Sequence, residues 1–188
     1  RQPFGTGDAV LSAADLLAGF QGRVLVVWST QPVICPETIR RTSTIAHLLD
    51  DYDMILPTTF KERPYAPLVR DDCARVKVAY ETHSENLERP SFGETNIGLF
   101  LLKSKPMFET LGELRRRYWD ESCKCYDRPR GELGFPNELV NEFGKRQKGV
   151  FACAIAGSEE EQGIKELADI ERCERIILQN RASNEHLP

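Results

Sequence analysis

The chain has 188 residues, of which 40% are hydrophobic and 29% are charged, and its formal net charge is -4. This length allows one sizeable core, so we expect a single domain over residues 1–180 and a loose tail over residues 181–188. Basic residues are scattered or lie beside acidic ones, which argues against nucleic acid or an anionic membrane surface as a partner. The sequence contains nothing that resembles a signal peptide, and no apolar run approaches the roughly 20 residues that span a bilayer. We therefore expect a cytoplasmic protein.

The first third of the chain predicts a helix, a strand and a second helix. Apolar residues recur at helical spacing over residues 7–19, and Gly22 ends the pattern. Residues 23–28 consist of Arg23 and a continuous apolar run rich in valine, which predicts a strand buried on both faces of a parallel sheet. The polar residues 29–32 follow it, and ligands gather at the carboxyl ends of strands in open α/β sheets. Pro36 predicts the first turn of the next helix.

The rest of the chain continues to alternate strands with helices. Residues 65–70 and 75–80 flank the polar turn 71–74 and predict an antiparallel hairpin inserted into the α/β pattern. Residues 120–137 contain prolines and glycines and predict a loop. The other predicted strands are 54–59, 97–102 and 149–156, and the other predicted helices are 107–119, 137–143 and 159–180, the last interrupted at Gly163.

The six cysteines do not form a repeated framework, so we expect no disulfides in a cytosolic protein of this size. Cys123 and Cys125 offer two thiolates to a metal ion. Metal sites usually place two to four residues between such cysteines, whereas only Lys124 separates this pair, and no second pair or nearby histidine follows. A chance pair is therefore the favoured interpretation, and zinc binding is a distant alternative.

The segment Gly5–Thr6–Gly7 has two interpretations. Glycine allows a ligand to approach the backbone closely, and the first turn of a helix carries unpaired N–H groups, so the segment fits a ligand-binding loop. It also fits an ordinary helix start capped by Thr6. The residues of this segment alone favour the second interpretation.

Several segments, in order, resemble the sugar-1-phosphate nucleotidyltransferases, in particular the N-acetylglucosamine-1-phosphate uridylyltransferase domains and the MobA-like group. The segments are 5–10, 24–32, 65–70, Glu81, 96–98 and 163–164. The resemblance implies a three-layer, Rossmann-like α/β fold with a mixed, mostly parallel sheet and an inserted β-hairpin. It also implies an enzyme that makes a nucleotide sugar and pyrophosphate from a nucleoside triphosphate, with UTP favoured, and a sugar 1-phosphate, using Mg²⁺.

The resemblance also implies roles for individual residues. On the nucleotide side they are Gly5, Thr6, Thr30 and Gln31, and on the sugar side Ala66, Glu81, Asn96 and Glu132. A carboxylate such as Glu81 can accept two hydrogen bonds from sugar hydroxyls. Without the resemblance, Glu81 would be an exposed charge at a strand end and Asn96 a turn residue.

The sequence also departs from the family. The family's glycine-rich loop, which carries its catalytic basic groups, is expected to precede Arg1, so the catalytic residues are unknown and this chain alone is expected to be inactive. Thr30 stands where the family has a metal-binding aspartate, and a hydroxyl is a poor ligand for Mg²⁺. The second metal position falls near Lys165 or Glu166, of which only Glu166 could bind a metal ion. A degenerate module that binds nucleotide sugars without chemistry is therefore the alternative function.

Four further side chains could contact a ligand, namely Trp28, Tyr65, His83 and Phe135. Packing in the core or at the rim is the default for the aromatic residues, and a lone surface histidine is usually unremarkable.

Overall fold

The computed structural model describes residues 4–82 and 85–184, so His83 lies outside the described residues. The helices are α1 (Thr6–Leu11), α2 (Pro36–Leu48), α3 (Ser104–Tyr118), α4 (Pro136–Phe143) and α5 (Leu167–Asn184), with short 3-10 turns η1 (Pro129–Gly131) and η2 (Ser158–Glu161). The strands are β1 (Arg23–Val27), β2 (Met54–Glu62), β3 (Leu68–Arg70), β4 (Val76–Ala79), β5 (Phe92–Asn96), β6 (Leu99–Lys103), β7 (Trp119–Asp120), β8 (Cys125–Tyr126) and β9 (Val150–Ala154).

The main sheet has the order β1-β6-β2-β5, with β9 also paired to β2. The β2–β9 pairing is parallel, whereas β1–β6, β2–β6 and β2–β5 are antiparallel. The predicted mixed α/β fold is thus confirmed, although the sheet of the described residues is less parallel than expected. The predicted hairpin is also confirmed, because β3 and β4 form a separate antiparallel pair.

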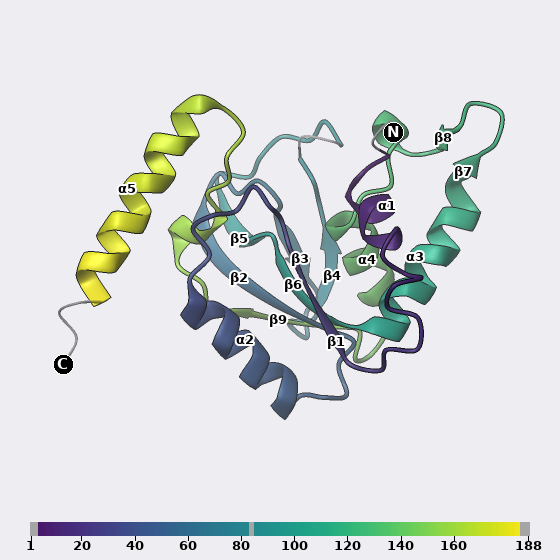
Figure 1. Ribbon diagram of the computed structural model, residues 1–188, viewed down its shortest axis with the longest axis horizontal. Coiled ribbons are helices and arrows are strands. Elements are labelled where there is room, and N and C mark those ends of the chain that lie inside the picture. Colours follow the sequence, from purple (N-terminus) through teal and green to yellow (C-terminus); the bar gives the residue numbers. More distant parts are fainter. Residues whose placement is uncertain (1–3, 83–84, 185–188) are drawn as a thin grey trace.

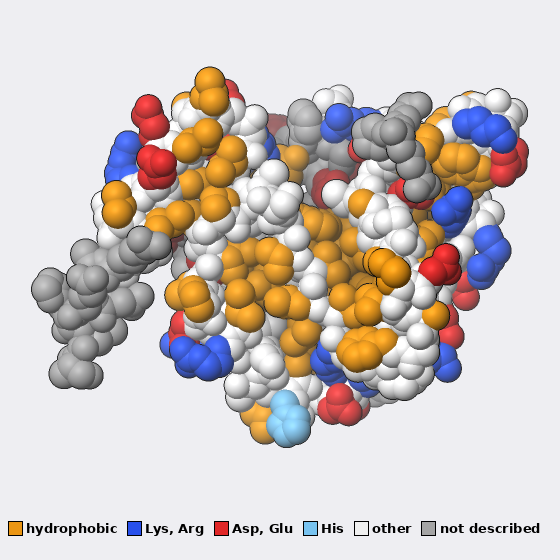
Figure 2. All heavy atoms as spheres, in the orientation of Figure 1, with side chains coloured by type: hydrophobic (Ala, Val, Ile, Leu, Met, Phe, Trp, Pro, Cys, Tyr) orange, Lys and Arg blue, Asp and Glu red, His pale blue; other side chains and the backbone are white. Residues whose placement is uncertain are grey.

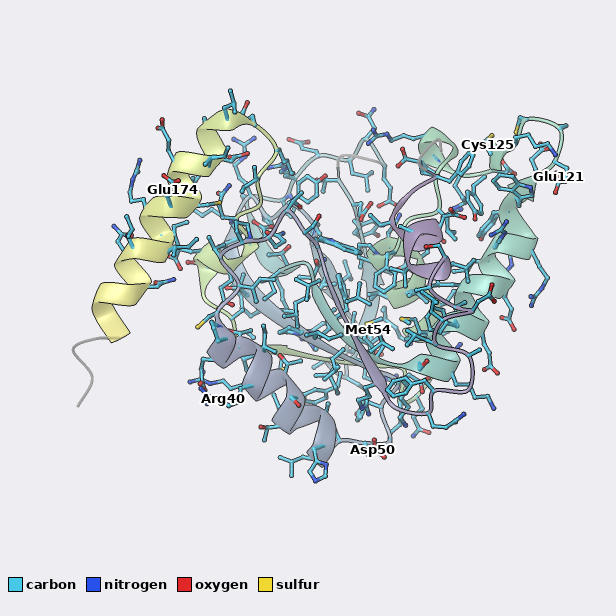
Figure 3. All side chains as sticks on the ribbon, in the orientation of Figure 1. Arg40, Asp50, Met54, Glu121, Cys125 and Glu174 are labelled. Atoms are coloured by element: carbon cyan, nitrogen blue, oxygen red, sulfur yellow. The ribbon has the colours of Figure 1, made fainter. Side chains whose placement is uncertain are left out.

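Helices cover both faces of this sheet (Figure 1). On one face, α3, α4 and the β3–β4 hairpin pack on the larger core cluster, which includes Met54, Phe100 and Phe135. On the other face, α2 packs through Ala46 against Ile55 and Leu101. Met54 is fully buried near the middle of the ribbon in Figure 3. The result is the predicted three-layer arrangement, with Phe135 in the core.

β1 differs from the prediction of a strand buried on both faces. It is an edge strand, paired among the described residues only to β6. Val24 and Val26 pack on the larger core cluster, but Leu25 and Val27 are each 41% exposed on the opposite face. Hydrophobic side chains gather on the surface seen in Figure 2, on the side where β1 crosses the front of the molecule in Figure 1.

β5 was not predicted, because its sequence is polar and lacks an apolar alternation. A buried ion pair accompanies it. Arg70 of β3 donates to both oxygens of Glu94 on β5 at 2.7 Å, and Thr58 of β2 donates to Glu94 Oε1 at 2.6 Å. This network joins the hairpin to the main sheet.

The carboxyl-terminal region contains a break near the predicted Gly163. The turn η2 ends at Glu161 and α5 begins at Leu167, so the long predicted helix is two elements. Within η2, Glu160 accepts hydrogen bonds from the N–H of Cys35 and the hydroxyl of Thr38, both at 2.8 Å, and so caps α2. α5 runs to Asn184, into the predicted tail. No helix of the described residues is long and apolar enough to cross a membrane.

Candidate functional site

A pocket with a volume of about 340 Å³ lies between α1, the segments that flank the β3–β4 hairpin, and the start of α4. Its lining residues are Gly5, Thr6, Ala9, Tyr65, Glu81, Pro129, Arg130, Glu132, Gly134, Asn137 and Glu138. They come from three stretches that are far apart in sequence. Gly5, Thr6, Glu81 and Glu132, all predicted to contact ligand, therefore meet in one place.

The wall beside α1 depends on a glycine. Gly5 has a φ of 97°, and a Cβ added to it would lie 2.3 Å from the carbonyl oxygen of Leu133. Gly7 donates its N–H to that same oxygen at 2.9 Å, and the N–H of Leu133 donates to the carbonyl of Phe4 at 2.8 Å. The N–H of Gly7 is thus already bonded within the protein. Gly5, and not Thr6 as expected, occupies the cap position of α1.

One side of the pocket is acidic. Glu81, Glu132 and Glu138 all line it, and Glu138 is only 6% exposed at the start of α4. Burial raises the pKa of Glu138, and the guanidinium of Arg128 opposes the shift through a hydrogen bond of 2.6 Å from its Nε. The neighbouring Asn137 is 7% exposed, and its Oδ1 has no hydrogen-bond partner among the described residues.

Two cations lie over the ring of Tyr65, which lines the pocket. The ammonium of Lys165 lies 3.3 Å from the centre of the Tyr65 ring, and the guanidinium carbon of Arg89 lies 5.1 Å from it. Burial, followed by the charge of Glu81, raises the pKa of Tyr65. Burial, followed by the charge of Arg89, lowers the pKa of Lys165. Acidic groups suited to hydroxyls thus lie near cations suited to an anion.

Asn96 does not line the pocket with Glu81, contrary to the prediction. It is 4% exposed, its Oδ1 accepts from the N–H of Gly98 at 3.1 Å, and its Nδ2 lies 3.5 Å from the carbonyl oxygen of Ala66. Ala66 is buried as well, directly after Tyr65. Both residues are therefore buried, and neither lines the pocket.

Thr30 and Gln31 lie outside the pocket, against the turn at Gly163. The carbonyl of Thr30 accepts from the N–H of Ile164 at 2.8 Å, and its side chain is exposed. The Oε1 of Gln31 is buried, has no partner among the described residues, and lies 3.2 Å from where a Cβ of Gly163 would be. The turn that follows β1 thus meets the turn that follows η2, and Thr30 and Gln31, which were predicted to bind nucleotide, do not line the pocket. Trp28 packs on Phe100 and Phe135, with ring centres 5.3 and 5.4 Å away.

The residues present do not fit a resident Mg²⁺ ion. Thr30 offers a hydroxyl, and the exposed Glu166 is the single carboxylate that was expected to contribute. No group of three or more His, Cys, Asp or Glu side chains in residues 4–82 and 85–180 is placed to hold a metal ion.

Sequence reasoning missed Arg130, Asn137 and Glu138. All three lie in or next to the predicted loop 120–137, and a loop predicted from glycines and prolines carries no information on which side chains face a pocket. The available signal was the proline at the start of the helix, which places Asn137 and Glu138 in its first turn.

Comparison with solved structures identifies the class of fold. HddC from Yersinia pseudotuberculosis superposes with a TM-score of 0.54 at 17% identity, over 93% of this chain and 64% of that one. The 4-diphosphocytidyl-2C-methyl-D-erythritol synthase from Anaerococcus prevotii superposes with a TM-score of 0.56 at 12% identity, over 92% of this chain and 64% of that one. The chain therefore shares the fold of these two proteins. No family model matches the chain.

Proteins of similar sequence include the bifunctional proteins GlmU of several bacteria. The chain is 24% identical over 188 residues to the bifunctional protein GlmU of Lactococcus lactis subsp. lactis. The alignment covers 99% of this chain and 38% of that protein. It is 27% identical over 179 residues to GlmU of Pelobacter propionicus, covering 94% of this chain and 36% of that protein. The chain is thus similar to one part of these proteins, and it spans just over a third of their length.

Proposed function

We propose that this domain serves nucleotidyl transfer to a sugar 1-phosphate, with the nucleotide base against Gly5 and Thr6 and the sugar against Glu81 and Glu132. The pocket that gathers these four residues from three distant segments carries the proposal. The GlmU relatives and the nucleotidyltransferase fold support it.

In this reaction, an oxygen of the sugar phosphate attacks the α-phosphorus of the nucleoside triphosphate. A phosphorus–oxygen bond forms to the sugar phosphate, the bond to the β-phosphate breaks, and pyrophosphate leaves. The part played by the described residues is to position the substrates. Glu81 and Glu132 accept hydrogen bonds from sugar hydroxyls, and the backbone at Gly5 lets a base approach closely. UTP as the triphosphate and the cytoplasm as the location remain predictions.

A binding module without chemistry is the second candidate, and one observation favours it. Lys165 and Arg89 both lie on the Tyr65 ring, and neither forms an ion pair within the described part of the chain. Two cations held on one ring can bind the diphosphate of a nucleotide sugar without a metal ion. Thr30, a poor metal ligand, is consistent with this candidate.

One pair of measurements tests both candidates. UDP-N-acetylglucosamine is titrated into the wild-type chain, Glu81→Gln and the control Glu113→Gln, which alters an exposed residue of α3. We expect Glu81→Gln to weaken binding about tenfold, because a hydrogen bond to a charged group contributes about 1.5–3 kcal/mol, and the control to bind normally. Pyrophosphate release from UTP and N-acetylglucosamine 1-phosphate is then measured. Turnover would support transfer and contradict the module. Binding without turnover fits both candidates, because this chain alone is expected to be inactive, and equal affinity of all three proteins contradicts the site.

A further inference from the structure

The short hairpin β7–β8 brings two thiols into contact. Its register pairs Trp119 with Tyr126 and Asp120 with Cys125, so the chain reverses over residues 121–124. Within this turn, Lys124 has a φ of 54°. The Sγ atoms of Cys123 and Cys125 lie 2.7 Å apart. The backbone of the hairpin, and not a distant element, holds the two sulfurs together.

Both thiols are open to reagents. Cys123 is exposed and Cys125 is partly exposed. The hairpin continues from the end of α3 at the periphery of the molecule, and Figure 3 shows Cys125 and Glu121 there, far from the buried Met54. The described part of the chain offers no third ligand that would make this pair a metal site. Two adjacent accessible thiols instead form the reduced half of a dithiol–disulfide couple.

Cys125 also lies beside Gly131, which is next to the candidate pocket. A Cβ added to Gly131 would lie 3.2 Å from the Cβ of Cys125 and 3.7 Å from its Sγ. Gly131 stands between Arg130 and Glu132, which both line the pocket. The Cys125 side chain therefore lies next to the backbone that carries two pocket residues.

We propose that Cys123 and Cys125 form a reversible disulfide by exchange with a small-molecule disulfide, and that its formation changes the ligand affinity of the adjacent pocket. The change in ligand affinity rests on the proposed function, whereas the formation of the disulfide does not. The more exposed Cys123 is the attacking thiol. The hydrogen bond with Cys123, followed by burial, raises the pKa of Cys125, which disfavours its thiolate in the reduced pair and leaves the first attack to Cys123.

The exchange balances in two steps. The Cys123 thiolate attacks one sulfur of the oxidant and releases one thiolate, which leaves a mixed disulfide on Cys123. Cys125 loses its proton to water and attacks the Cys123 sulfur, so that the second thiol of the oxidant leaves. The protein loses two electrons and two protons, and the oxidant becomes two thiols.

Peptide mapping tests the disulfide. The protein is incubated with glutathione disulfide, alkylated and digested with trypsin, which cleaves after Lys124 and so separates Cys123 from Cys125. We expect the two resulting peptides to remain joined, or the uncleaved peptide to lose about 2 Da, and dithiothreitol to reverse the change. Cys125→Ser should instead stop at a glutathione adduct on Cys123, and the control Cys73→Ser should behave as wild type. Separate alkylated or glutathionylated peptides from the wild type would overturn the proposal.

Affinity measurements test the coupling. UDP-N-acetylglucosamine is titrated into the reduced and oxidised wild type and into Cys123→Ser treated with the same oxidant. We expect at least about a threefold change between the two wild-type forms, and no change for Cys123→Ser. Equal affinities of the two wild-type forms overturn the coupling. If the reduced protein binds no nucleotide sugar, the proposed function and the coupling both fail, and the mapping still decides the disulfide.

Discussion

The phenol of Tyr126 donates a hydrogen bond of 2.6 Å to Oδ1 of Asp8, and it joins β8 to α1 across more than a hundred residues of sequence. Tyr126 is 1% exposed, so this bond is shielded from water. Asp8 has a further partner in Arg115, at 3.9 Å. The bond fixes the first turn of α1, which forms one wall of the pocket.

We expect Tyr126→Phe to lower the free energy of unfolding by about 1.5–3 kcal/mol, because it removes a buried hydrogen bond to a carboxylate while it keeps the ring. Urea denaturation measures the change. The control is Tyr52→Phe, since the hydroxyl of Tyr52 has no recorded hydrogen bond within the described residues. Equal losses in the two variants would mean that the bond to Asp8 contributes nothing specific.

A second prediction concerns Glu94. Burial alone would raise its pKa, but the hydrogen bonds from Arg70 and Thr58 outweigh burial and hold the pKa below its ordinary value of 4.5. The unfolded chain therefore binds the proton more tightly than the folded protein. The resulting stability is present above pH 4.5 and is lost as the pH falls through the pKa of the folded state.

We expect Glu94→Gln to cost about 3 kcal/mol at neutral pH, because it leaves Arg70 without its buried partner. The difference from wild type should narrow as the pH falls below 4.5. Urea unfolding over a series of pH values measures it, with the exposed Glu62→Gln as the control. A difference that stays constant over this range would show that the charge of Glu94 is not the cause.

Gly5 allows a prediction that separates backbone strain from lack of space. Gly5→Ala places a Cβ 2.3 Å from the carbonyl oxygen of Leu133, whereas Gly19, with a φ of 81°, has open space around it. We expect Gly19→Ala to cost about 1 kcal/mol for its φ alone. Gly5→Ala should cost at least about 2 kcal/mol and weaken nucleotide-sugar binding, because Leu133 must move. Thermal unfolding and ligand titration of both variants measure the two effects. Equal losses of stability and of affinity in the two variants would contradict the close approach of Gly5 to the carbonyl oxygen of Leu133.

The metal position is tested at Thr30. We expect the wild-type chain to bind Mg²⁺ weakly without nucleotide, since the described residues offer no cluster of ligands. Thr30→Asp should tighten binding in the presence of UTP if this residue stands at the metal position that the resemblance implies. Calorimetric titration with Mg²⁺ gives the affinities, and Ser29→Asp is the neighbouring control. An unchanged affinity in folded Thr30→Asp would show that the end of β1 is aligned wrongly.

The sequence predicted those elements whose own residues show the apolar spacing or the turn residues typical of a strand, hairpin or helix. The hairpin β3–β4 follows from two apolar segments around Asp71, whose Oδ1 accepts from the N–H groups of Cys73 and Arg75 at 3.0 and 2.9 Å. The helix α1 ends at Leu11, before the predicted residue 19, because helical spacing alone does not show where tertiary contacts stop. β5 escaped prediction because Arg70 and Thr58, which satisfy its Glu94, come from other strands.

The site residues likewise divide into those that the sequence predicted and those that depend on contacts between distant residues. Gly5, Thr6, Glu81 and Glu132 were found through the resemblance, and the fold brings them together. Asn96 was wrongly predicted to line the pocket. The spacing of a motif does not reveal that the Oδ1 of Asn96 already accepts a hydrogen bond from the N–H of Gly98. Lys165 was considered only as a failed metal ligand, since its contact with Tyr65 spans a hundred residues and has no local signature.

The exposed edge of β1 has a consequence for handling the protein. A strand whose outer N–H and C=O groups lack a neighbouring strand is a template for pairing with another chain, and exposed Leu25 and Val27 make such pairing more favourable. We expect the domain to self-associate as its concentration rises, through extension of the sheet. Leu25→Lys should suppress this in sedimentation experiments, because a lysine on an edge strand opposes the approach of a second copy.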